Sequence, residues 1–440
     1  MAAALAIGLH EEAEAQDRKA ALLLTNVRIF DGPSGRFAEP QDLLIRDGRI
    51  AQVGAVTETN AFRIDAGGAY ALPGLWDSHV HLTPLTMRGG DTLAATLDSM
   101  ARHGVLYVRD VGGPLDVIAA IARRIANGEL RGPTIFYGGP LAERPPLYWA
   151  RYNTMLPGFT VPIESERDVD ALVSKIASAG GAFVKVFGKW DRQLFRFLRS
   201  QAMDRSLGVV VDPGTPLFQD LPVDTLLAME VTSIEHAHAP WLSLLRADLR
   251  ARHDSIAAPG VDPSRRGPFA LEVISLGPNS FGDGQLRRLG EVWKRSGIFF
   301  CPTLRVSENR RRTLPPVPST SSDEERARFW NGWADASVAV TRSLASQGIP
   351  LLIGQDDLEP MATFDEMELL ARIGVPSADV LRAATLYPAR SMKREADLGS
   401  IETGKVGDVV LFRGDPLENM GHVRSPWLVV QRGEVIHKRD

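Results

Sequence analysis

Short apolar runs separated by turn residues mark both ends of the chain. Near the start, the runs LLLTNVRIF and LLIRDGRIAQV are typical of strands, and Asp47-Gly48 inside the second run predicts a hairpin turn. Near the end, DVVLF and WLVVQRGEVIHK repeat this pattern, with Arg432-Gly433 as a second turn. Because the region between them has a different pattern, we expect both ends to meet in one small β-sandwich domain of residues 22–72 and 398–440.

The middle of the chain alternates strand-like apolar runs with stretches of helical periodicity. The segment DVDALVSKIASAGG, for example, has apolar residues at Val169, Leu172, Val173 and Ile176, which is the spacing of one helical face. Repeated β/α units predict an α/β fold, namely a (β/α)8 TIM barrel over residues 73–397. The expected strands are residues 72–81, 105–113, 134–140, 182–188, 209–212, 232–238, 298–303 and 350–356.

One segment interrupts this alternation. Residues 241–283 are rich in Gly, Pro and Ser. A loop of that length in a compact barrel is typical of a lid or a substrate-binding insertion. A second polar run, TLPPVPSTSSDEERAR, follows the seventh expected strand, and we expect it over the same rim.

Composition excludes several classes of protein. The chain has 440 residues, of which 44% are hydrophobic and 24% charged, a balance typical of globular proteins. Its net charge of −4 provides no basic field for nucleic acid, and no apolar run is long enough to span a membrane. A single cysteine, Cys301, excludes an intrachain disulfide framework. We therefore expect a soluble protein with a small-molecule substrate, and a monomer and a homo-oligomer both remain open.

The beginning of the chain permits two interpretations. Residues 1–21 precede the first strand-like run and form an N-terminal tail. An apolar stretch followed by Ala13 and Ala15 mimics a secretory leader with its cleavage site, but a basic start is missing. A leader remnant of a periplasmic or secreted protein and a plain tail of a cytoplasmic protein both remain open.

Two histidines at the end of the first barrel strand are candidates for metal ligands. His79 and His81 are two residues apart, and side chains at that spacing point to the same side of a strand. Both imidazoles can therefore converge on one ion. Their position after Pro73-Gly74, where the chain enters the predicted barrel, favours this interpretation over an incidental pair. Cys301 is expected to fill space in the seventh strand, because no activating base lies near it in sequence.

Several segments together resemble the amidohydrolase superfamily, in particular its imidazolonepropionase and prolidase-like branch. The likeness spans about residues 22–435, nearly the whole chain, and its motifs occur in the order of the family. These motifs are LPGLWDSHVHL, VRDVGG, AFVKVF, SIEHAH, LLIGQDD and GKVGDVVLFRGDPLENM.

The resemblance implies a metal-dependent hydrolase with one or two divalent ions, zinc being the expected metal. Carried over residue by residue, it assigns the first ion to His79, His81 and Asp356. It assigns the second to His236, with a carbamate formed from CO2 on Lys185 bridging both ions. Asp356 would also act as the general base and acid, although the neighbouring Asp357 is an alternative for that position. In the superfamily the metals activate water for attack.

The sequence departs from the family where a histidine is expected after the fifth strand. Asp212 stands at that position, in LGVVVDPGTP. It can bind a second ion through oxygen, since zinc accepts carboxylates. Alternatively, the second site is empty and Asp212 neutralises an uncarbamylated Lys185 as a buried ion pair. Both interpretations remain open.

Residues over the expected barrel mouth are candidates for substrate binding. His238 shares the face of His236, and the loop after the third strand carries Arg144, Tyr148 and Arg151. Arginines and aromatic residues together suit an anionic or aromatic substrate, such as a carboxylate held by a guanidinium. A surface or interface loop is the alternative.

These observations together predict hydrolysis of a carbon–nitrogen bond in a small molecule. An N-acyl amino acid, a dipeptide and a cyclic amide are the substrate classes expected. Because of Asp212, a catalytically impaired or mononuclear homologue that uses the barrel mouth for binding is the first alternative. A deaminase of the same superfamily is the second.

Overall fold

The computed structural model describes residues 21–439, apart from residues 59, 318–321, 358 and 360. The predicted N-terminal tail, with its leader-like residues 1–16, lies outside the described residues except for Ala21, which opens the first strand. Along the described part of the chain, no helix is both long and apolar enough to cross a membrane.

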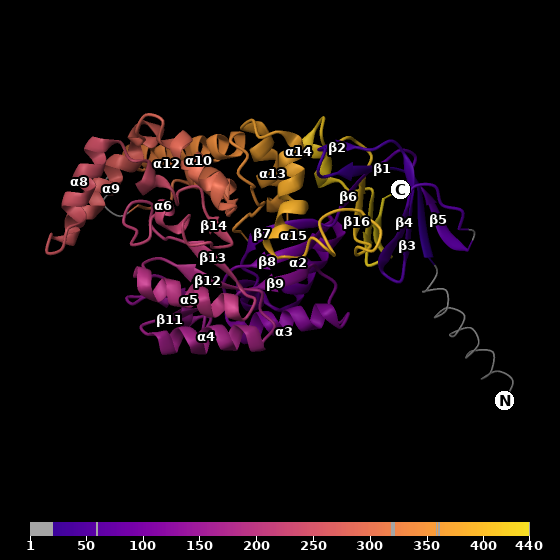
Figure 1. The fold of residues 1–440 in the computed structure, drawn as a ribbon, viewed down its shortest axis with the longest axis horizontal. Helices are drawn as coiled ribbons and strands as arrows, with labels where there is room; N and C mark the ends of the chain where they lie inside the picture. Colours follow the sequence, from indigo (N-terminus) through magenta and orange to yellow (C-terminus); the bar gives the residue numbers. More distant parts are fainter. Residues whose placement is uncertain (1–20, 59, 318–321, 358, 360, 440) are drawn as a thin grey trace.

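Strands from both ends of the chain form one sheet (Figure 1). Its order is β18-β17-β16-β6-β1-β3-β4, with β2 and β5 also paired to β1. The long strand β1 joins two halves, because it pairs with β3 near Leu23 and with β6 at Arg28 and Ile29. The strands are β1 (Ala21–Asp31), β2 (Arg36–Phe37), β3 (Gln41–Arg46), β4 (Arg49–Val53), β5 (Ala61–Asp65), β6 (Tyr70–Pro73), β16 (Val409–Phe412), β17 (Leu428–Gln431) and β18 (Glu434–Lys438).

Both predicted hairpin turns are confirmed. Asp47 and Gly48 connect β3 to β4, and Arg432 and Gly433 connect β17 to β18. All four residues have φ between 50° and 81°, the left-handed backbone that the tightest hairpin turns require at both central positions. The second residue of each turn is glycine, for which this conformation carries no steric cost.

Parallel strands form the centre of the molecule. A three-stranded sheet has the order β7-β8-β9, and a six-stranded sheet has the order β11-β10-β12-β13-β14-β15. Their central strands are buried on both faces, as parallel strands covered by helices are. The strands are β7 (Leu75–Val80), β8 (Val105–Asp110), β9 (Thr134–Tyr137), β10 (Leu141–Glu143), β11 (Thr160–Pro162), β12 (Phe183–Phe187), β13 (Gly208–Asp212), β14 (Ser233–Glu235) and β15 (Phe299–Cys301).

Backbone hydrogen bonds connect these two sheets at both ends. The Ala182 amide donates to the Tyr137 carbonyl at 2.9 Å, between β9 and β12. On the other side, Leu352 donates to Phe300 at 2.8 Å and Ser78 donates to Ile353 at 2.6 Å, so residues 351–353 bridge β15 and β7. The arrangement is TIM-barrel-like. Seven of the eight expected strands are present, and the eighth, 350–356, is reduced to a bridge at Leu351.

Helices follow the strands and cover the parallel sheets, and α8 and α9 lie at the end of the molecule opposite the sheet of the chain ends (Figure 1). The α-helices are α2 (Gly90–Arg102), α3 (Leu115–Ala126), α4 (Glu166–Ser178), α5 (Arg192–Asp204), α6 (Val223–Leu226), α7 (Trp241–Leu244), α8 (Ala247–Ala257), α9 (Arg266–Ser275), α10 (Gln285–Ser296), α11 (Leu304–Thr313), α12 (Asp323–Ser346), α13 (Ala362–Arg372), α14 (Ser377–Ala383) and α15 (Leu386–Ser391). Short 3-10 turns are η1 (Thr83–Arg88), η2 (Ala150–Thr154), η3 (Pro263–Arg265), η4 (Gly277–Ser280) and η5 (Met420–Arg424).

The prediction of a long loop over residues 241–283 is wrong, because this segment is largely helical. It contains α7, α8 and α9. The apolar side chains Phe269, Val273 and Ile274 of α9 pack in one cluster with Trp330 and Trp333 of α12. Burial of these side chains stabilises helices that the Gly, Pro and Ser content of the segment argues against.

The barrel-like part and the sheet of the chain ends are joined through a buried contact. The Tyr107 hydroxyl of β8 donates to the Asp408 carboxylate at 2.6 Å, and the two residues are 301 positions apart in the chain. The Gly74 amide donates to the Asp408 carbonyl at 3.0 Å, next to the pairing of β6 with β16.

Candidate metal centre

Three side chains converge at the carboxyl end of β7. The His79 Nε2 and His81 Nε2 atoms lie 3.6 and 3.4 Å from Asp356 Oδ1. The possible ligand atoms of the three residues all lie within 4.8 Å of one another. The Asp356 amide also donates to the His79 carbonyl at 2.8 Å, which ties the end of the eighth segment to β7. Two imidazole nitrogens and a carboxylate oxygen in this arrangement can bind one divalent cation.

Hydrogen bonds fix how the two imidazoles point. His79 Nδ1 lies 2.7 Å from Glu235 Oε2, and His81 Nδ1 lies 3.0 Å from the Gly112 carbonyl oxygen. Because both partners are acceptors, each Nδ1 carries a proton, and each Nε2 is the nitrogen that faces Asp356. This orientation is the usual one for metal-binding histidines supported by a carboxylate or a carbonyl group.

Glu235 is itself held by a buried arginine. Arg109 Nη2 donates to both carboxylate oxygens of Glu235, at 2.8 and 2.9 Å, and its Nη1 donates to Ser233 at 2.8 Å. Burial opposes ionisation of Glu235, but Arg109 and His79 outweigh it and hold the pKa of this carboxyl well below its usual value. Glu235 is therefore a fixed anion that orients His79.

Glu235, His79 and Cys301 also lie close enough together to bind an ion, but their chemistry favours another role. His79 Nδ1 already donates to Glu235, and Arg109 neutralises that carboxylate. Burial raises the pKa of the Cys301 thiol well above its usual value, so the thiol stays protonated. A protonated thiol is a poor metal ligand, and we interpret this group as the support of His79.

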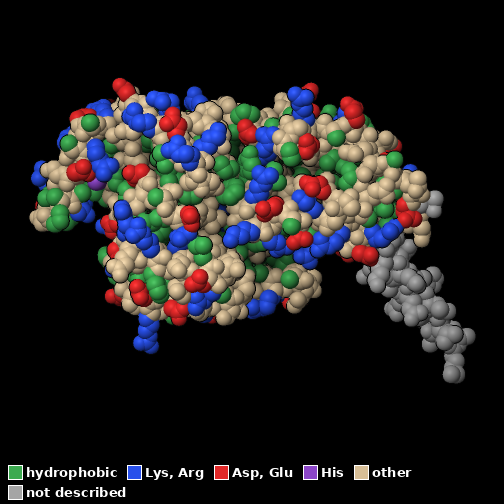
Figure 2. All heavy atoms as spheres, viewed as in Figure 1, with side chains coloured by type: hydrophobic (Ala, Val, Ile, Leu, Met, Phe, Trp, Pro, Cys, Tyr) green, Lys and Arg blue, Asp and Glu red, His purple; other side chains and the backbone are tan. Residues whose placement is uncertain are grey.

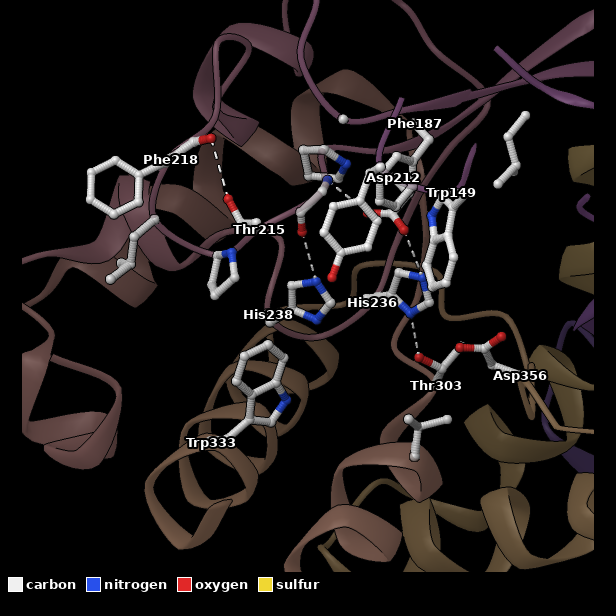
Figure 3. A pocket seen from close by; sticks show the side chains of 18 of the residues that line it. Trp149, Phe187, Asp212, Thr215, Phe218, His236, His238, Thr303, Trp333 and Asp356 are labelled. Atoms are coloured by element: carbon white, nitrogen blue, oxygen red, sulfur yellow. Dashed lines mark hydrogen bonds and ion pairs between the residues drawn. The ribbon is translucent and has the colours of Figure 1, made fainter. Parts of the chain in front are cut away.

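A second pair lies beside the first three residues. His236 Nε2 lies 3.1 Å from Asp212 Oδ2, at the end of β13. Its Nδ1 lies 2.7 Å from the Thr303 hydroxyl (Figure 3). The His236 ring centroid is 4.8 Å from that of His79. Burial raises the pKa of Asp212, but the neighbouring His236 and Lys185 outweigh it and bring the pKa to about 2. Asp212 is thus an anion next to His236.

Lys185 is buried in β12 and carries the only amine among the residues expected to bind metal. Its Nζ atom has no hydrogen-bond partner among the described residues, although it lines the same cavity as His79 and Asp212. Taking a charged ammonium out of water without a partner is costly. The orphaned amine therefore fits a site that is completed by a further group, as a carbamate bridging two cations would complete it.

Electrostatics favour cation binding at this centre. Burial lowers the pKa of His79 to about 3, and the charge of Lys185 acts in the same direction. Burial opposes ionisation of Asp356, yet the neighbouring histidines, His79 and then His81, hold its pKa well below the usual value. Near neutral pH the centre thus offers the neutral imidazole of His79 and an ionised Asp356, the forms that bind metals.

The rim residues that carry these groups have unusual backbone conformations. His236, Thr303 and Asp356 have φ values of 70°, 45° and 50°. This left-handed region is costly for residues other than glycine, and such strain is concentrated at functional sites. The three residues follow β14, β15 and the eighth barrel segment, so the chain turns sharply at the same rim.

A large cavity opens at the centre (Figure 3). Its volume is about 1170 Å³, and it is lined by the five residues expected to hold metal and by Asp212. Aromatic side chains line both of its flanks. Those from the β10 region and β12 are Tyr148, Trp149, Tyr152, Phe159 and Phe187, and those from the region of Phe218 and α12 are Phe218, Phe329, Trp330 and Trp333.

The outer surface differs from this cavity. On the face shown in Figure 2, basic and acidic side chains are interspersed, and no extended area of one sign is seen.

Three of the four predicted substrate-binding residues line the cavity, and the fourth does not. Arg144, Tyr148 and His238 line the cavity. Arg144 forms an ion pair with Asp191 at 2.8 Å, so its guanidinium is already engaged. Arg151 is not among the residues that line the cavity, and its guanidinium lies over the rings of Trp149 and Tyr152 instead.

His238 contacts His236 on the side of the cavity wall. The two rings are stacked, with centroids 5.2 Å apart and planes 9° apart. Its Nε2 lies 3.0 Å from the Gly214 carbonyl oxygen, and burial together with the His236 charge lowers its pKa to about 3. His238 is therefore a neutral donor to the backbone that shapes the cavity wall.

Asp357, the alternative to Asp356 as general base, lines the same cavity but is paired with Arg305. Its Oδ2 lies 2.5 Å from Arg305 Nη1, whereas Asp356 is the residue that faces both histidines.

Sequence reasoning missed Arg109 and Thr303 and gave no role to Glu235. The importance of Arg109 could have been predicted, because a charged residue inside the apolar run VLYVRD requires a buried partner. No sequence pattern indicated the role of Thr303, because its contact with His236 spans 67 positions in the chain.

The chain is similar to known proteins over most of its length. Residues 310–437 match the model of the Amidohydrolase family. An uncharacterized protein of Mycobacterium tuberculosis is 26% identical over 403 residues, covering 89% of this chain and 90% of that protein. Imidazolonepropionase of Thermoplasma acidophilum is 22% identical over 417 residues, covering 91% of this chain and 90% of that enzyme.

A solved structure is also similar over nearly the whole chain. It is a prolidase complexed with N-methylphosphonate-L-proline, with a TM-score of 0.72 and 20% identity, covering 96% of this chain and 100% of that one. The predicted TIM-barrel-like domain with a second domain is thereby confirmed at the level of the fold. The predicted resemblance to the amidohydrolase superfamily and its imidazolonepropionase and prolidase-like branch is confirmed.

Proposed function

We propose that this protein is a metal-dependent hydrolase of amide-type carbon–nitrogen bonds in small molecules. The observation that carries the proposal is the convergence of His79, His81 and Asp356 at the floor of a large aromatic cavity. The match of residues 310–437 to the Amidohydrolase family model and the similarity of the fold to a prolidase support it. The substrate classes proposed are N-acyl amino acids, dipeptides and cyclic amides.

The donor set fits a divalent cation, of which zinc is the best match to two imidazoles and a carboxylate. His79, His81 and Asp356 would hold one ion, and His236, Asp212 and a carbamate on Lys185 would hold a second. When bound, such ions supply Lewis acidity toward a carbonyl group and toward water.

The residues of the chain perform the remaining tasks. Asp356 accepts the proton of the attacking water on its carboxylate and delivers it to the leaving nitrogen, which is general base and then general acid catalysis. Glu235 and Arg109 keep the imidazole of His79 in one orientation, and Thr303 does so for His236. The aromatic walls of the cavity exclude water from the reacting bond.

Asp212 is proposed as an oxygen ligand of the second ion. The alternative, a direct ion pair between Asp212 and Lys185, requires these groups to be in contact. Among the described residues, however, Lys185 forms no ion pair within 4.0 Å, and Asp212 pairs with His236. This geometry favours the binuclear interpretation.

Substitution of Asp212 by asparagine is expected to lower the metal content from about two ions to about one per chain, because a neutral amide is a weak ligand. Metal analysis of the purified wild type, D212N and D212H measures this. The exposed Asp204 on α5 provides a control, and D204N should keep two ions. One ion in the wild type that rises to two in D212H would instead support the ion-pair alternative.

A panel of amides tests the reaction itself. The wild type with its metals should release amine from N-acyl amino acids, dipeptides or cyclic amides. Turnover of amino-heterocycles alone would favour the deaminase. Metal-free protein without turnover of any compound would favour a binding protein.

A further inference from the structure

We infer that Arg310 recognises a carboxylate group of the substrate, so that the protein acts on amides of bulky apolar amino acids with a free carboxylate. The inference rests on the proposed function and specifies its substrate class. Arg310 lies on α11, which begins directly after Thr303, the residue that orients His236. Its side chain lines the same cavity as His79 and Asp356.

Arg310 is positioned by two aromatic rings. Its guanidinium carbon lies 5.4 Å from the Trp330 ring centroid and 5.7 Å from that of Trp333. Trp333 in turn lies 4.9 Å from the ring of His238, and Figure 3 shows it beside His238 on the cavity wall. A chain of contacts thus leads from His236 through His238 and Trp333 to Arg310.

Three other arginines that line the cavity or lie on α11 each pair with a carboxylate. Arg144 pairs with Asp191, Arg305 with Asp357 and Asp365, and Arg311 with Asp335. Among the described residues, no acid forms an ion pair with Arg310. A planar guanidinium held over aromatic rings at an apolar wall is well suited to bind a carboxylate through two parallel hydrogen bonds.

The surrounding wall defines the rest of the substrate. Phe329, Trp330 and Trp333 pack in one apolar cluster with α9, the helix inserted after the sixth strand. An apolar side chain next to the bound carboxylate would contact these rings, while its amide faces the metal centre. Such a substrate is an N-acyl derivative of an aromatic or large aliphatic amino acid.

Arg266 is the competing residue. It lines the same cavity, lies over Phe218 at 5.3 Å, and its Nε has no hydrogen-bond partner among the described residues. The guanidinium of Arg266 contacts the ring of Phe218. That of Arg310 contacts Trp333, which in turn contacts His238 beside the metal centre. We therefore assign the carboxylate to Arg310 and use R266Q for comparison.

The first test compares two substrates that differ in one group. For N-acetyl-L-phenylalanine, R310Q should lower kcat/KM roughly 10- to 100-fold, as expected for loss of a charge-assisted pair of hydrogen bonds. For the corresponding carboxamide the change should stay below about 3-fold. Arg312, which is exposed on the same helix and hydrogen-bonded to Asn309, provides the matched control R312Q, which should resemble the wild type for both compounds.

The second test measures binding without turnover. Trp330 and Trp333 beside Arg310 provide a fluorescence signal for titration with 3-phenylpropanoate and with the neutral 3-phenyl-1-propanol, neither of which can be hydrolysed. The metal-loaded wild type should bind the carboxylate at least about 10-fold more tightly than the alcohol, and R310Q should lose this preference.

The two tests separate the two proposals. If the wild type binds the carboxylate through Arg310 but hydrolyses no amide, the proposed function fails, whereas the assignment of Arg310 as the carboxylate-binding residue stands. Equal affinity of wild type and R310Q for the carboxylate would overturn the inference. Loss of the preference in R266Q, with R310Q unaffected, would overturn it as well.

Discussion

Substitution of Asp356 by asparagine is expected to lower kcat by about 1,000-fold or more, while the chain remains folded. The carboxylate lies 3.4 and 3.6 Å from the histidine nitrogens, and in the proposed mechanism it both binds metal and moves the proton. General acid and base groups contribute about 10²- to 10⁴-fold each. Steady-state kinetics on the best amide, with metal content measured in parallel, provides the test.

Asp357 is the informative comparison for this variant. It is adjacent in sequence, but it pairs with Arg305 instead of facing the histidines. D357N should therefore cost less than about 10-fold in kcat. A loss in D357N equal to that in D356N would show that the general base has been assigned to the wrong residue.

Substitution of Glu235 by glutamine is expected to destabilise the fold by about 3–5 kcal/mol, because it leaves the buried charge of Arg109 without its partner. Both side chains are almost completely inaccessible to solvent. The free energy of unfolding from denaturant titration of metal-free protein measures this effect. The same variant should weaken metal binding about 10- to 100-fold, since His79 loses the acceptor that fixes its tautomer.

A double variant separates charge from packing. R109M combined with E235Q removes both charges and should recover part of the lost stability. The half-exposed pair of Arg102 and Asp98 on α2 provides a surface control, and R102Q should change stability by less than about 1 kcal/mol. Equal changes in the free energy of unfolding for E235Q and R102Q would contradict the larger contribution assigned to the buried pair.

The sequence predicted single strands well, and it also predicted which residues lie at the carboxyl ends of the parallel strands. The apolar runs of β7, β12 and β13 predicted strands, and the i, i+2 spacing of His79 and His81 predicted a shared face. Their approach to Asp356 followed from barrel topology together with the family resemblance. The eighth segment was predicted as a strand. Its backbone groups bond to β7 and to β15, as those of the last strand of a barrel do, but only Leu351 forms a regular bridge.

Features that depend on distant partners could not be predicted. The composition of residues 241–283 indicates a loop, yet Phe269 and Val273 become buried against α12. Arg144 was predicted to bind an anion, but Asp191, 47 positions away, already pairs with it. Arg310 stands in the run RRR, which by local pattern is an exposed helical surface, and only the fold brings it to Trp330 and Trp333.

The contact between Tyr107 and Asp408 has a consequence for biosynthesis. Strand β6 is made early, but its neighbour β16 follows only after the entire barrel-like part has been synthesised. During translation the edge of β6 therefore stays open, and an open edge can pair with other chains. Ribosome-bound or truncated chains that end before β16 should depend on chaperones to avoid aggregation, whereas release of the last strands closes the sheet and buries Asp408.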